Sequence, residues 1–84
     1  MDPLEQLAAA LDLEAPTGQE TARVLDLARD VAHGTERKLT PLATLLLGMS
    51  VQRRMTEGAT RSEALDAAIA DLRAALPPVA ETDA

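Results

Sequence analysis

The sequence contains no phenylalanine, tyrosine or tryptophan, and it contains no cysteine. Without aromatic rings, the core has to be built from aliphatic side chains and alanine, which bury less area per residue. Without cysteine, the chain forms neither a disulfide nor a thiolate metal site, which fits the cytoplasm. A chain of 84 residues is one domain that buries only about 60–65% of its unfolded surface. We therefore expect a thin core that a partner surface would stabilise.

Positive charge and long apolar runs are also scarce. Eight Lys and Arg residues face fourteen Asp and Glu residues, for a net charge of −6. The basic residues are dispersed among acids, which argues against binding to a nucleic-acid backbone. The longest apolar run, residues 42–51, is about half of the ~20 residues that cross a bilayer. The acidic amino end is unlike a signal peptide. We expect a cytoplasmic protein that binds neither nucleic acid nor membrane.

Capping signals and apolar periodicity predict helices, and no strand-like alternation occurs. The first helix is expected over residues 3–13, with Asp2 as its N-cap. The second follows Thr17, because the spacing from Thr17 to Glu20 is typical of a capping box. We expect it to end at Gly34 in the left-handed conformation that closes many helices.

The third helix is expected over about residues 41–57, with Thr40 as its cap, and the fourth over residues 61–76. The third is the most apolar and has two apolar faces. One carries Leu42, Leu45, Leu46 and Met49, and the other carries Leu47, Val51 and Met55. The predicted fold is all-α: a small four-helix bundle with the third helix at its centre. It forms a single domain over residues 1–76, followed by a flexible acidic tail over residues 77–84.

A polar face of the second helix is the first candidate site. Asp26, Arg29, Asp30 and His33 share this face. Zinc sites use more than one His or Cys, and this chain has a single histidine. Local charge pairs and a histidine at a helix end explain the same residues without a ligand. We expect no metal, no cofactor and no catalytic residue here.

The second apolar face of the third helix is the stronger candidate, and it has two interpretations. It is either internal core or a stripe that docks on another chain. Gly48, beside the stripe, would then allow a close backbone approach. Arg53 lies in line with the first apolar face, so its stem follows the core edge or its charge meets an acid on a partner. The candidate interface residues are Leu47, Gly48, Val51, Arg53 and Met55.

Two segments carry a resemblance to a known family. LARDVAHG at residues 27–34 and TPLATLLLG at residues 40–48 are similar to a small bacterial domain of unknown function. Members of that family are often described as molybdopterin-guanine dinucleotide biosynthesis proteins. Some are fused to, or encoded near, the guanylyltransferase that adds GMP to molybdenum cofactor. The resemblance covers roughly residues 4–72. Family members often carry an aromatic residue where this chain has Leu45 or Leu46.

The resemblance implies an accessory role. The transferase itself needs an α/β nucleotide-binding domain with a glycine-rich loop, which this sequence lacks. We therefore expect a non-catalytic adaptor that docks on the guanylyltransferase or on a molybdoenzyme maturation factor. The alternative is a self-associating helical domain, a homodimer unrelated to that pathway. A third class is a ligand-binding protein that uses the face of Arg29, Asp30 and His33.

Overall fold

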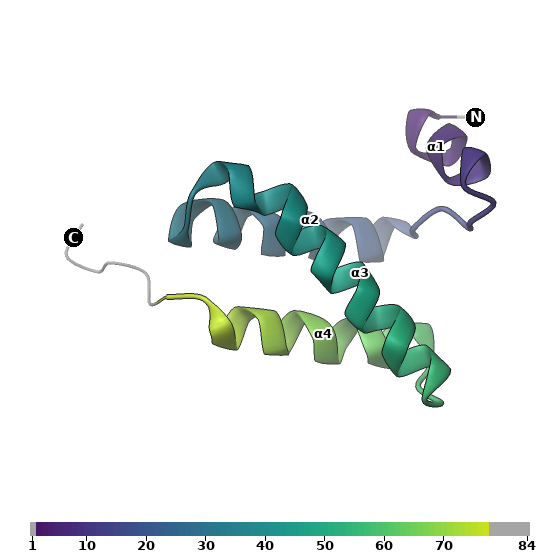
Figure 1. Ribbon diagram of the computed structural model, residues 1–84. Coiled ribbons are helices and arrows are strands. Elements are labelled where there is room, and N and C mark those ends of the chain that lie inside the picture. Colours follow the sequence, from purple (N-terminus) through teal and green to yellow (C-terminus); the bar gives the residue numbers. More distant parts are fainter. Residues whose placement is uncertain (1, 78–84) are drawn as a thin grey trace.

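The computed structural model describes residues 2–77, which form helices joined by short connections (Figure 1). The elements are α1 (Pro3–Ala10), α2 (Gly18–Gly34), a 3-10 turn η1 (Arg37–Leu39), α3 (Thr40–Thr56) and α4 (Arg61–Ala75). The predicted all-α class and its four α-helices are confirmed, and no strand occurs between residues 2 and 77. The tail expected over residues 77–84 lies, from residue 78 onward, outside the described residues.

The core lies where α3 meets α2 and α4. α3 packs against both of these helices, which also touch each other, and in Figure 1 it runs diagonally across them. This confirms α3 as the central helix. Leu27 and Val31 of α2 are the largest fully buried side chains. The core cluster is aliphatic, as the composition requires: Leu27, Val31, Leu47, Leu65, Ala68 and Ile69.

α1 stands apart from these three helices. No Cα atom of α1 lies within 8 Å of another helix, and Figure 1 shows α1 beyond the amino-terminal end of α2. The chain turns sharply after α1, because Asp12 has a φ of 58° and the Leu13 N–H donates to the Ala8 carbonyl at 2.9 Å. α1 is therefore shorter than the expected 3–13, and the bundle consists of three packed helices with a fourth beside them.

The predicted helix starts at Thr17 and Thr60 are confirmed. In each capping box the threonine hydroxyl accepts the N–H of the glutamate three residues later, and that glutamate accepts the threonine N–H. Asp2 and Glu5 form a third box of the same kind at the start of α1. Local sequence chemistry thus sets where α1, α2 and α4 begin.

Two predicted helix caps are wrong. Thr40 does not cap α3: it is already helical, with φ −57° and ψ −51°, because η1 leads directly into the helix. α2 ends at Gly34 as predicted, but Gly34 is not left-handed: it is the last helical residue, and Thr35 caps the helix by donating its N–H to the Val31 carbonyl at 2.9 Å. Among the described residues, Gly58 after α3 is the glycine with a positive φ, 111°.

Candidate functional site

The polar face of α2 is used to join helices. Arg73 of α4 donates from Nε to Asp30 Oδ2 and from Nη2 to Asp26 Oδ2, both at 2.9 Å. Arg29 adds a 3.5 Å ion pair with Asp26. His33 is exposed in the last turn of the helix. The helical spacing placed the two aspartates together correctly, but sequence reasoning missed Arg73, which lies 43 residues from Asp30.

These residues do not assemble a metal site. Between residues 2 and 77, no three His, Cys, Asp or Glu side chains are grouped so that they could hold a metal ion. Both aspartates already bind a guanidinium, so metal binding would first have to break the contact between α2 and α4. The polar face of α2 therefore holds α2 and α4 together on the outside of the bundle; we call this set of Arg73 hydrogen bonds the clamp.

A second link between α2 and α4 centres on Glu20. The Arg61 guanidinium donates from Nε to Glu20 Oε2 at 2.8 Å and from Nη2 to Oε1 at 3.0 Å. Glu20 Oε1 also accepts the Thr17 N–H at 2.9 Å. The backbone hydrogen bond from Thr17 and the neighbouring Arg61 hold the pKa of Glu20 below its ordinary value, against the opposing effect of desolvation.

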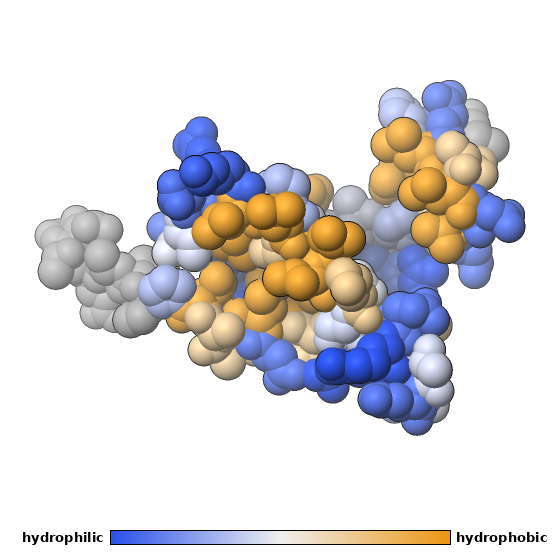
Figure 2. Space-filling view, viewed as in Figure 1, coloured by the Kyte–Doolittle hydropathy of each residue, from blue (hydrophilic) through white to orange (hydrophobic). Residues whose placement is uncertain are grey.

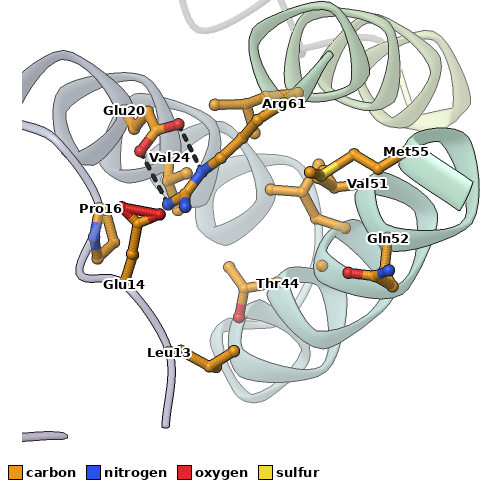
Figure 3. Close-up of a pocket in the computed structure, with 13 residues that line it drawn as sticks. Leu13, Glu14, Pro16, Glu20, Val24, Thr44, Val51, Gln52, Met55 and Arg61 are labelled. Carbon is orange, nitrogen blue, oxygen red and sulfur yellow. Dashed lines mark hydrogen bonds and ion pairs between the residues drawn. The ribbon is translucent and has the colours of Figure 1, made fainter. Parts of the chain in front are cut away.

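This ion pair borders a pocket of about 380 Å³ between the α1–α2 connection and helices α2, α3 and α4. Figure 3 shows Arg61 and Glu20 at one edge and Leu13 at another. The volume is in the range of small-molecule sites. The Glu20 carboxylate and the Arg61 guanidinium bind each other, however, and most of the remaining lining is apolar. The pocket is therefore mainly an apolar shape, and Glu14 is the lining carboxylate that has no ion pair with a described residue.

The apolar face of α3 that the docking interpretation places at the surface lies partly in the core. Leu47 is only 5% exposed and Val51 packs, half-buried, against the core. The core interpretation therefore applies to Leu47, whereas Met55, at the other end of the stripe, is 37% exposed. Gly48, Val51 and Met55 line the pocket. An added Cβ at Gly48 would meet nothing within 4 Å, so no close backbone approach explains this glycine.

The other apolar face of α3 is turned to solvent. We call it the outer α3 face; its four side chains are 55–60% exposed, and they are Leu42, Leu45, Leu46 and Met49. Figure 2 shows a continuous hydrophobic patch over α3 with hydrophilic surface at both ends. A smaller hollow of about 230 Å³ adjoins the patch between Leu46, Leu72 and Ala75. From the sequence, the candidate interface was placed on the other apolar face, that of Leu47, Val51 and Met55.

Arginines lie near both ends of the outer α3 face. Arg37, in η1, precedes the face, and Arg53 follows Met49 by four residues, one helical turn along the same side. Both are exposed, and neither forms an ion pair with any described residue, whereas Arg54 next to Arg53 pairs with Asp71. The position of Arg53 in line with the leucines was the sequence signal that this side is solvated.

A protein-family model described as "Domain of unknown function (DUF6457)" matches residues 3–84. No curated protein and no solved structure matches the chain. Among residues 2–77, no helix has the length and apolar character needed to cross a membrane.

Proposed function

This chain belongs to the DUF6457 family, whose description names no activity, and we propose from its geometry that it is a non-catalytic adaptor. The adaptor docks on another protein through the outer α3 face. The main observation behind this proposal is that the four large apolar side chains of the outer α3 face are each more than half exposed. Single exposed leucines are ordinary, but a contiguous apolar patch marks an interaction surface.

The shape of this surface suits a helix of the partner. Leu42, Leu46 and Met49 form a ridge along α3, and the hollow beside Leu46 can take a protruding side chain. Helix-in-groove recognition uses this combination of an apolar strip and a side-chain hollow. Arginines at the rim then add orientation through contacts with acids.

The resemblance to proteins described as molybdopterin-guanine dinucleotide biosynthesis proteins suggests which partner to test. We propose the molybdenum cofactor guanylyltransferase, or a molybdoenzyme maturation factor, as the protein that docks. The segments that carry the resemblance, residues 27–34 and 40–48, include three of the four outer-face residues. Self-association of the domain without any tie to that pathway is the second candidate, and the same exposed face supports it.

Titration calorimetry with purified guanylyltransferase tests the proposal. The full chain is expected to bind, and Leu46→Glu is expected to weaken binding at least tenfold because it places a charge in the patch. Leu25→Glu is the matched control, since Leu25 is 62% exposed on α2, outside the outer α3 face. Equal binding by all three chains would reject this face as the docking surface. Micromolar binding of GTP to the chain alone would reject the non-catalytic role.

A further inference from the structure

α1 packs against no other helix of its own chain, although its Ala8 is buried (7% exposed). It has eight residues, fewer than the ~12–15 that an isolated helix needs to be even marginally stable in water. Its apolar residues are Leu4, Leu7 and Leu11, the last at its C-cap, and they are 41%, 64% and 70% exposed. We call these three residues the α1 strip. A capped amphipathic helix of this length requires a complementary surface.

The α1 strip and the outer α3 face match in length. Leu4 and Leu11 are seven residues apart, as are Leu42 and Met49, and at 1.5 Å per residue each strip is about 10 Å long. Figure 2 shows both as hydrophobic surfaces on separate parts of the molecule, each with hydrophilic surface around it. Each surface is therefore long enough to cover the other.

Their charges also complement each other. Residues 2–14 contain Asp2, Glu5, Asp12 and Glu14 and no Lys or Arg, and none of these acids forms an ion pair within the described chain. The outer α3 face has the unpaired Arg37 and Arg53 near its two ends. Acids lie at both ends of α1, so the arginines can be neutralised in either helix direction.

We infer that α1 of a second copy of this chain occupies the outer α3 face. Each copy has one α1 strip and one outer α3 face, so two copies can satisfy both contacts by exchanging α1 reciprocally, and we infer this closed two-fold dimer rather than a chain of copies. Within one chain, by contrast, α1 is held beyond the end of α2 and touches no other helix. The inference rests on the proposed function because it uses the same docking surface, the outer α3 face. It adds that α1 of a second copy binds there. A partner protein that uses this face has to displace α1.

Sedimentation velocity of the full chain over a hundredfold concentration range tests the inference. The chain is expected to shift from monomer to dimer, and Leu7→Glu and Leu46→Glu are each expected to weaken dimerisation at least tenfold. Both variants should keep the far-UV circular dichroism of α2, α3 and α4 and lose at most the contribution of the eight-residue α1, because both side chains lie outside the core. Leu25→Glu, at an exposed site outside both surfaces, should dimerise as the wild type does.

A mixing experiment identifies the reciprocal geometry. The Leu46→Glu chain has an intact α1 strip and the Leu7→Glu chain has an intact outer α3 face, so their mixture retains one of the two contacts. We expect a heterodimer to form in the mixture although each variant alone is monomeric.

A wild-type chain that stays monomeric at every concentration would overturn the inference. This holds also if the monomer arises because α1 packs on α3 of the same chain. So would a dimer that Leu7→Glu leaves intact, since the outer faces would then pair directly. Neither result touches the proposed function, which fails instead if Leu46→Glu leaves binding to the partner protein unchanged.

Discussion

At the scale of single residues, Glu20 links local and tertiary structure. Its carboxylate completes the capping box that starts α2 and also accepts both hydrogen bonds from Arg61 at the start of α4. The Arg61 side chain is 41% exposed and that of Glu20 is 18% exposed. The pair is therefore only partly protected from water, and its contribution to stability lies nearer that of a surface pair than of a buried one.

Glu20→Gln is expected to destabilise the protein by about 1 kcal/mol at pH 7. Because the folded state lowers the pKa of Glu20 from its ordinary value of 4.5, its charge stabilises the fold above that pH. This contribution is lost as pH falls through the lower folded pKa. Urea unfolding should therefore show a difference between wild type and variant at pH 7 that shrinks at pH 3. Glu14→Gln, at an acid without an ion pair, is the control and should show little difference at either pH.

His33→Gln is expected to change the free energy of unfolding by no more than ~1 kcal/mol, the size of a helix-terminus charge effect. His33 is exposed in the last turn of α2 and stands outside the clamp that Arg73 forms with the aspartates. Arg73→Gln is the comparison, since it removes two hydrogen bonds between α2 and α4 and should cost more. A loss of several kcal/mol for His33→Gln in urea unfolding would reveal a role that its exposed position does not show.

At the scale of elements, the residues at which helices begin could be predicted from the sequence. The side chains that pair between helices could not. The threonine–glutamate spacing acts within one turn, so Thr17 and Thr60 could be assigned as caps from the sequence alone. The prediction that Thr40 caps α3 was wrong because the 3-10 turn η1 leads directly into the helix. The Thr40 hydroxyl is buried there without a hydrogen-bond partner. The partner of Asp26 and Asp30 lies on another helix, which no local pattern specifies.

Gly48→Ala is expected to stabilise the protein by about 0.5–1 kcal/mol, because glycine inside a helix is unfavourable relative to alanine. Gly48 is exposed within α3 and an added Cβ meets no atom within 4 Å. Gly58→Ala should have the opposite sign, since Gly58 has a φ of 111° that alanine adopts only with strain. Thermal unfolding of the two variants would test the pair; a destabilised Gly48→Ala would contradict the open space seen beside Gly48.

At the scale of the whole molecule, the orientation of α3 was not encoded in its periodicity. Both faces repeat at helical spacing, so hydrophobic pattern alone does not say which one turns inward. The choice depends on where α2 and α4 pack, and these helices cover Leu47 and Val51. A chain with no aromatic residue and a small aliphatic core is left with two separate apolar surfaces, on α1 and on α3. We propose that these two surfaces are the parts of the molecule that a partner contacts.

Val51→Glu and Leu46→Glu are expected to separate core from surface on one helix. Val51 packs against the core cluster, so a glutamate there is forced either to lose water without a partner or to open the bundle, at a cost of several kcal/mol. Leu46 is 59% exposed, so the same charge there should leave the monomer folded. Far-UV circular dichroism and urea unfolding should show lost helicity or stability for Val51→Glu and near-native values for Leu46→Glu. The reverse result, with Leu46→Glu unfolded and Val51→Glu helical, would mean that α3 turns its other face to the core, and that the outer α3 face is not the docking surface.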